Sequence, residues 1–278
     1  MKQKSAKLQS IISVVFSFIL TVLILILLLA MGLYFGAFNE KIIKLKVSES
    51  NYYNETYSLI YDNAKTIVAD AGLPVTVLED AVTLERVYIG GKYYVEDVLA
   101  GKQPTYKTEK LEDTLRSNID NYLATQKVTI TDELKVGTDE LVAKVSQEYR
   151  RGIQFDFINS ISKLKQAYMH IILIGVPILL VLMAAIIFIL TRMYKYKHRG
   201  IRYINSSVIT ASAMVGIITL IMLITRSYNI TAQPKYYMVF LNNYFKWNIQ
   251  IYLCMAGFGI ITSVLLFVLT RHLKENIR

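Results

Sequence analysis

The sequence predicts an all-α membrane protein with four transmembrane helices and an α-helical extracytoplasmic domain inserted between helices 1 and 2. Four runs lack Asp, Glu, Lys and Arg: 8–39, 166–191, 203–225 and 247–270. Each has at least the ~20 residues that a helix needs to cross a bilayer core. Because backbone in lipid must satisfy its own hydrogen bonds, these runs are expected to be helices.

Charge is divided sharply between the parts of the chain. Residues 39–165 hold 20 of the 21 acidic residues and 17 of the 31 basic ones, whereas the remainder carries 14 basic residues against Glu275 alone. The net charge of +10 therefore reflects basic residues beside the spans, and we expect contact with the lipid bilayer rather than with nucleic acid.

The positions of these basic residues predict the orientation of the chain. Four crossings place 11 of them on one side, against three on the other. The larger group is Lys2, Lys4, Lys7, Arg192, Lys195, Lys197, Arg199, Arg202, Arg271, Lys274 and Arg278; the smaller is Arg226, Lys235 and Lys246. The positive-inside rule then places both termini in the cytoplasm and residues 39–165 outside.

The expected organisation follows from these runs. The segments are a cytoplasmic N-terminus (1–10), transmembrane helix 1 (11–38), the extracytoplasmic helical domain (39–165), transmembrane helix 2 (166–191), a basic cytoplasmic loop (192–203), transmembrane helix 3 (204–225), an external aromatic loop (226–247), transmembrane helix 4 (248–270) and a cytoplasmic C-terminus (271–278). We expect the first span to remain as an anchor, because its apolar run is about twice the length of a signal-peptide core.

Helical periodicity predicts several helices within 39–165. The first begins at Ser48 or Ser50 and ends near Ala71, because Gly72 and Pro74 are typical helix terminators. Thr76 begins a short helical turn, and Thr83 and Thr108 precede two further helices. The expected buried faces are Tyr53, Tyr57, Ile60, Ala64 and Val68; Leu84, Val87, Tyr88, Tyr94, Val95 and Val98; and Leu111, Leu115, Ile119, Tyr122 and Leu123.

The last part of this domain is expected to run helically into the second span. Thr131 and Thr138 each precede Asp-Glu, which favours a helix start. The apolar positions Leu141, Val145, Tyr149, Ile153, Phe157 and Ile161 keep the helical period across Gly152, where an interruption is expected. The pair Gly90-Gly91 predicts a kink or break in the helix after Thr83, since each glycine costs about 1 kcal/mol relative to alanine.

Three tyrosines are candidates for a partner surface. Tyr52, Tyr93 and Tyr106 fall off the expected buried faces, and exposed tyrosines supply contact area for proteins or glycans. Core packing is the alternative interpretation. Tyr236, Tyr237, Phe240, Tyr244, Phe245 and Trp247 are instead typical of an interfacial aromatic belt.

Four small residues are candidates for helix–helix packing in the membrane. Ser212 and Gly216 in the third span, and Gly259 and Ser263 in the fourth, each have small-xxx-small spacing.

No catalytic residue, cofactor site or metal site is predicted. The spans lack the ionisable side chains that mark ion paths, apart from His170 at the expected outer surface. His170, His198 and His272 are divided between the two sides of the membrane, and the single cysteine, Cys254, lies in a span. No zinc-protease or phosphate-loop motif occurs. We therefore expect a non-enzymatic protein.

Gly72-Leu73-Pro74, followed by Val87, Tyr93, Val98 and Gly101, resembles a pattern in uncharacterised multi-pass membrane proteins of low-GC Gram-positive bacteria. In that group one N-terminal span precedes a helical extracytoplasmic domain and further spans. The resemblance covers residues 1–195. It implies a bacterial plasma membrane and this architecture, but no activity and no functional residues.

The expected role is recognition or scaffolding outside the cell through residues 39–165, with a probable protein partner in the membrane or outside. The alternative is an accessory subunit of a membrane transport or export complex whose partner supplies the charged path. A membrane enzyme using His170 is the third reading.

Overall fold

The computed structural model describes residues 2–129 and 131–275, with side chains from Leu8 onward. Its described elements are helices, and no strand occurs in that part of the chain. They divide into two compact units: residues 1–43, 167–232 and 241–278, and residues 44–166 and 233–240. The all-helical fold predicted from the sequence is thus confirmed for the described residues.

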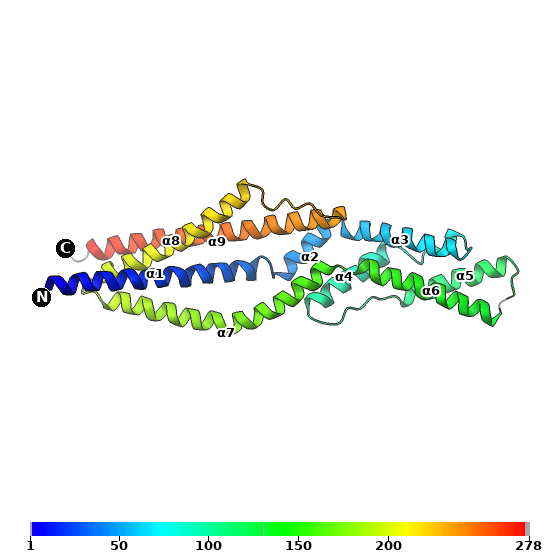
Figure 1. The fold of residues 1–278 in the computed structure, drawn as a ribbon, viewed down its shortest axis with the longest axis horizontal. Coiled ribbons are helices and arrows are strands. Elements are labelled where there is room, and N and C mark those ends of the chain that lie inside the picture. The colour runs from blue at the N-terminus through cyan, green and yellow to red at the C-terminus, as the bar shows by residue number, and fades with distance from the viewer. Residues whose placement is uncertain (1, 130, 276–278) are drawn as a thin grey trace. The chain divides into compact units, whose positions relative to one another are not determined.

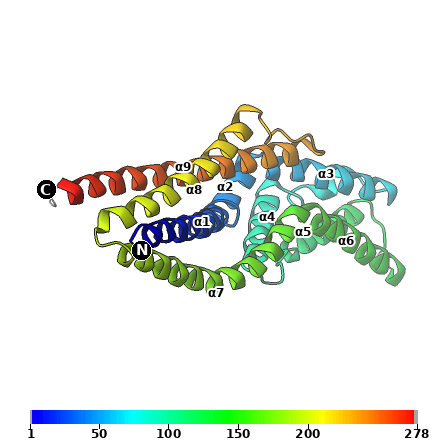
Figure 2. The ribbon, with the colours of Figure 1, turned by 60° about the vertical axis from the view of Figure 1, so that its left-hand side comes forward.

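The first unit holds most of the length of four apolar helices, two of which begin in the second unit. They are α1 (Lys2–Phe35), α7 (Asp156–Arg192), α8 (Lys197–Ile224) and α9 (Lys235–Glu275), and each contains a stretch long and apolar enough to cross a membrane. Residues of α1, α7 and α8 form a common core, and Figures 1 and 2 show α1 alongside α8. The core residues are Leu20, Ile24, Ile186, Leu190, Ile204 and Ala211.

Exposed apolar side chains indicate that these helices meet lipid. On α7 alone, Ile171 is 69% exposed, Leu173 75% and Val181 68%. A soluble protein rarely shows so continuous an apolar surface to water. At 1.5 Å per residue, the 37 residues of α7 extend about 55 Å, well beyond a ~30 Å hydrocarbon core. The chain is therefore a membrane protein with four candidate spanning helices, each longer than the ~20 residues that a span requires.

The second unit is built mainly from shorter helices (Figure 1). Helix α3 packs against α6 and α4, and α5 packs against α6. The elements are α2 (Glu40–Glu49), α3 (Tyr52–Asp70), the 3-10 helix η1 (Val75–Leu78), α4 (Leu84–Leu99), α5 (Glu109–Thr125) and α6 (Asp132–Ile153).

Local signals place several helix ends correctly. Gly72 has φ +71°, and the backbone N–H of Leu73 bonds to Val68 O at 3.1 Å, so α3 ends in the left-handed turn expected there. Thr83 and Thr131 cap α4 and α6 by accepting from the backbone N–H groups of Arg86 and Leu134. Thr108 precedes α5 without a side-chain capping bond.

Other local expectations are wrong. Thr76 does not begin the turn that follows Pro74 but lies within η1, after an N-cap at Pro74. Thr138 lies inside α6, where its hydroxyl donates to Leu134 O at 3.0 Å. The chain also breaks at Gln154 and Phe155, between α6 and α7, rather than at Gly152.

Glycines that suggested breaks instead mark close helix approaches. Helix α4 is continuous through Gly90 and Gly91. A Cβ at Gly90 would lie 2.5 Å from the Tyr149 hydroxyl, which donates to Arg86 O at 2.7 Å. A Cβ at Gly152 would lie 2.3 Å from Ile60 Cγ1. The helix-propensity cost of these glycines is offset by packing that no larger residue permits.

The expected external loop 226–247 is helical over much of its length. Helix α9 begins at Lys235, directly after Pro234. It continues through the aromatic-rich sequence because no Gly or Pro there ends it. Residues 233–240 belong to the second unit, where Tyr236, Tyr237 and Phe240 pack against the ring of Phe155. These three aromatics thus contribute to the core of the polar unit, a role that the belt interpretation did not include.

Candidate functional site

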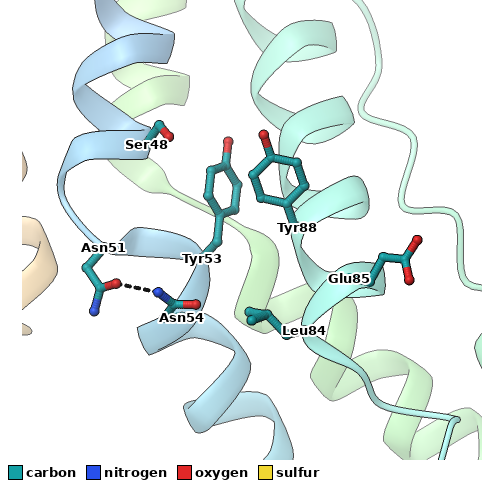
Figure 3. Close-up of a pocket in the computed structure, with 7 residues that line it drawn as sticks. All are labelled: Ser48, Asn51, Tyr53, Asn54, Leu84, Glu85 and Tyr88. Atoms are coloured by element: carbon teal, nitrogen blue, oxygen red, sulfur yellow. Dashed lines mark hydrogen bonds between the residues drawn. The ribbon is translucent and has the colours of Figure 1, made fainter.

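A pocket of about 450 Å³ opens where α3 and α4 begin (Figure 3). Its lining comes from the end of α2, the first turn of α3 and the first two turns of α4. The residues are Ser48, Asn51, Tyr53, Asn54, Leu84, Glu85 and Tyr88. This volume falls within the roughly 300–1,000 Å³ range of small-molecule sites, so the pocket is the candidate functional site.

The turn between α2 and α3 depends on Asn51. Its φ is 61°, a left-handed conformation that asparagine tolerates better than most residues with a side chain. The Ser50 hydroxyl donates to Val47 O at 2.7 Å, and Asn54 Nδ2 donates to the Asn51 side-chain oxygen. This amide pair fixes both carboxamides at one rim of the pocket (Figure 3).

Tyr53 and Tyr88 form the aromatic wall of the pocket. Their ring centroids lie 4.7 Å apart in an edge-to-face arrangement, and Figure 3 shows both hydroxyls pointing the same way. A Cβ at Gly91 would lie 3.0 Å from the Tyr53 ring, so the glycine lets this ring lie against α4. Tyr53 is half-buried, whereas Tyr88 is 45% exposed and presents its ring to a ligand.

The start of α4 directs charge away from the two rings. Arg86 turns toward the domain interior, where its guanidinium donates to Ala81 O at 2.8 Å and to the Thr114 hydroxyl at 3.0 Å. Glu85 is the one charged residue that lines the pocket, and its carboxylate points away from Tyr53 and Tyr88 (Figure 3). No charged side chain of the pocket lining therefore faces the rings, and the nearby Glu96 is paired with Lys44 at 3.3 Å.

The pocket hydroxyl of Tyr53 is protonated, and burial extends its protonated range to higher pH. Burial, followed by the nearby Tyr88 and Glu96, raises the pKa of Tyr53 to about 12. A phenol with this pKa is a neutral hydrogen-bond donor and acceptor at physiological pH.

The pocket residues were misassigned or overlooked in the sequence. Leu84 and Tyr88 were expected on the buried side of α4, yet they are 42% and 45% exposed. Periodicity did identify the rest of that face, since Val87, Tyr94, Val95 and Val98 are buried. The adjoining Tyr53 and Tyr88 are 35 positions apart in the chain, and no local pattern pairs them.

The three tyrosines expected at a partner surface lie in different environments. Tyr52 is fully buried, and its hydroxyl donates to Ile153 O, so its assignment to a surface is wrong. At the start of α3 the buried positions are Tyr52 and Thr56 rather than Tyr53 and Tyr57, whereas Ile60, Ala64 and Val68 are buried as expected. Tyr93 is 41% exposed beneath the Lys107 ammonium, and Tyr106 accepts from Gln154 Nε2 at 3.0 Å. None of the three lines the pocket.

A second pocket, of about 470 Å³, lies between α5 and α6. Its charges are already paired: Arg116 bonds to Asp139, and Arg150 bonds to Glu112 at 3.3 Å. Ser146 also donates to Glu112 at 2.5 Å, which lowers the pKa of that carboxyl. A ligand here would have to replace existing ion pairs, which makes this pocket the weaker candidate.

The four small residues of the spans lie at close contacts within the membrane unit. A Cβ at Gly259 would fall 1.9 Å from Ser212 Oγ, and one at Gly216 would fall 3.3 Å from Ala256 Cβ. Ser263 donates to the Asn205 side chain at 2.7 Å. Helices α8 and α9 therefore approach each other where the side chains are small.

Within residues 2–129 and 131–275, no three His, Cys, Asp or Glu side chains gather as a metal site would require. Comparisons with protein-family models, curated proteins and solved structures find no match to this chain. The chemistry of the pocket is therefore the basis for assigning a role.

Proposed function

We propose that this protein recognises an extracytoplasmic ligand through the domain at 39–165, with the pocket between α3 and α4 as its binding site. The observation that carries the proposal is the pocket itself, in which two tyrosine rings, two carboxamides and a hydroxyl converge on one space. Tyr, Asn and Ser are also the residues that recognition surfaces such as antibody paratopes use most.

Basic residues beside the spans support an external location. Eleven lie in segments that four crossings would place on one side, and three lie in the segment on the other side. The positive-inside rule assigns the larger group, and both termini, to the cytoplasm. The bacterial plasma membrane implied by the sequence resemblance is part of the same proposal, as is a role without catalysis.

Photo-crosslinking in intact native cells tests this role. A benzophenone amino acid at position 88 should form an adduct with an extracytoplasmic component. The same group at position 93 is the control, because Tyr93 is another exposed tyrosine of α4 outside the pocket. Equal yields at both positions, or none at either, would contradict recognition through the pocket.

The accessory-subunit alternative makes a different prediction. The apolar part of α7 favours this alternative, because only 6% of its most apolar 18-residue stretch is buried. Its sides are therefore open to another membrane protein. Benzophenone at the exposed Val181 would then capture a transport subunit in stoichiometric yield, while position 88 captures nothing.

A further inference from the structure

The geometry points to a neutral carbohydrate chain as the ligand of the pocket between α3 and α4. This inference rests on the proposed recognition function and names its ligand class. A sugar ring presents C–H groups on its faces and hydroxyls around its edge, so it needs an aromatic surface beside neutral hydrogen-bonding groups.

The aromatic requirement is met by Tyr88 and Tyr53. The edge-to-face arrangement of the two rings, 4.7 Å between centroids, offers two ring surfaces set at 61° to each other. Aromatic faces carry partial negative charge, which favours contact with the weakly positive C–H groups of a sugar. Leu84, at the base of the same space, adds an apolar contact (Figure 3).

Carboxamides and hydroxyls meet the second requirement. The carboxamides of Asn51 and Asn54 are hydrogen-bonded to each other, so both side chains are already ordered before a ligand binds. This preorganisation lowers the entropic cost of binding. The Ser48 hydroxyl and the protonated Tyr53 hydroxyl can each donate and accept, as sugar hydroxyls do.

The distribution of charge argues against other ligand classes. No Lys, Arg or His lines the pocket, so it lacks the usual partners of phosphate and carboxylate groups. Glu85 faces away from the rings, and Glu96 near Tyr53 already bonds to Lys44 at 3.3 Å, so a cationic peptide would have to compete with Lys44 for it (Figure 3). A peptide anchor also needs a deep apolar cavity, and the aliphatic lining here is Leu84, itself 42% exposed.

The test is a binding titration on the full-length protein in a polyoxyethylene detergent, since a maltoside detergent would present a competing sugar. The probes are cellotetraose, maltotetraose, mannotetraose and chitotetraose, with the peptides Ala-Lys-Ala-Lys and Ala-Glu-Ala-Glu for comparison. At least one oligosaccharide should bind with a Kd of about 1 mM or tighter, the range accessible to calorimetry or ligand-observed NMR.

Matched variants show where it binds. Tyr88→Ala should weaken binding about tenfold or more, equivalent to ~1.4 kcal/mol, and Asn54→Ala should weaken it in the same direction. Tyr93→Ala removes an equally exposed tyrosine of the same helix and should leave the affinity within about twofold. Binding that survives Tyr88→Ala, binding of a peptide in preference to the sugars, or no binding of any sugar overturns the inference.

The two proposals fail separately. If benzophenone at position 88 captures an external protein while no oligosaccharide binds, recognition stands and the carbohydrate assignment falls. If position 88 captures nothing and no probe binds, both fall.

Discussion

Phe155 stacks on Tyr52, with ring centroids 5.1 Å apart and ring planes inclined by 14°. Phe155 occupies the two-residue break between α6 and α7 and is 4% exposed, while the Tyr52 hydroxyl donates to the carbonyl of Ile153, the last residue of α6. Tyr236 and Phe240 meet the same phenylalanine edge to face. The helix break is thus held by aromatic packing from segments far apart in the chain.

Phe155→Ala should loosen this part of the polar unit. Truncating a buried phenylalanine costs about 3–5 kcal/mol, so hydrogen exchange of full-length protein should accelerate in residues 52–70 and 233–240. Phe157→Ala is the control for residues 52–70, because Phe157 is half-buried and its ring packs on Phe155, Tyr237 and Phe240. Equal acceleration of residues 52–70 in both variants would contradict the central role of Phe155.

Two glycines of α6 should respond in opposite directions to alanine. Gly152→Ala places a methyl group 2.3 Å from Ile60 Cγ1 and should destabilise the α3–α6 packing by about 1–3 kcal/mol. Gly137 has nothing within 4 Å of its Cβ position, so Gly137→Ala should stabilise α6 by about 0.5–1 kcal/mol. Thermal unfolding of the purified variants distinguishes the two. A shift of the same sign in both would contradict the assigned contact.

Acid should weaken the contact between α5 and α6 through Glu112. The hydrogen bond from Ser146 leads the interactions that lower the pKa of Glu112 below its usual 4.5. A lowered pKa means that the folded state favours the carboxylate, so this stabilisation is present above pH 4.5 and is lost as pH falls through the folded-state value. Hydrogen exchange of residues 109–125, corrected for intrinsic rates, should rise in that acid window.

Glu112→Gln removes this titration and should make the stability of α5 less dependent on acid pH. Asp113→Asn is the matched control, because Asp113 is a neighbouring exposed carboxylate outside the second pocket. An unchanged acid response in Glu112→Gln would show that other groups govern it.

Close contact between α8 and α9 should depend on Gly259. Gly259→Ile would collide with Ser212 Oγ and force the helices apart, which should lower the melting temperature in detergent. Gly257→Ile introduces the same side chain two residues earlier, where nothing lies within 4 Å. Size-exclusion chromatography after stepwise heating compares the two. Similar losses in both variants would mean that bulk, rather than this contact, causes the effect.

Features that depend on neighbouring residues could be predicted from the sequence. The charge-free runs match the four candidate spanning helices, because burial of charge in lipid is costly. Gly72, Thr83 and Thr131 marked helix ends through their own backbone or side-chain bonds. The buried face of α5 at Leu111, Leu115, Ile119 and Leu123 followed from helical periodicity.

Features that depend on distant residues could not be predicted in this way. Tyr53 and Tyr88 meet because α3 packs on α4. The space for the Tyr53 ring comes from Gly91, which in a sequence pattern is visible only as a residue of low helix propensity. Residues 233–240 pack against Phe155 although nearly 80 positions separate them in the chain. Such long-range contacts are set by the tertiary fold and leave no local sequence pattern. Tyr52 was misassigned because a shift of one residue turns a helix by about 100°.

The proposed recognition role depends on the side of the membrane on which residues 39–165 lie. Asp113 is exposed on α5, and Cys254 is the one native cysteine, so Asp113→Cys in a Cys254→Ser background provides a single reactive site in that domain. A membrane-impermeant maleimide should label it in intact cells, whereas cysteine at Lys195, in the basic loop between α7 and α8, should react only after lysis. Labelling of position 113 only after lysis would contradict an extracytoplasmic domain.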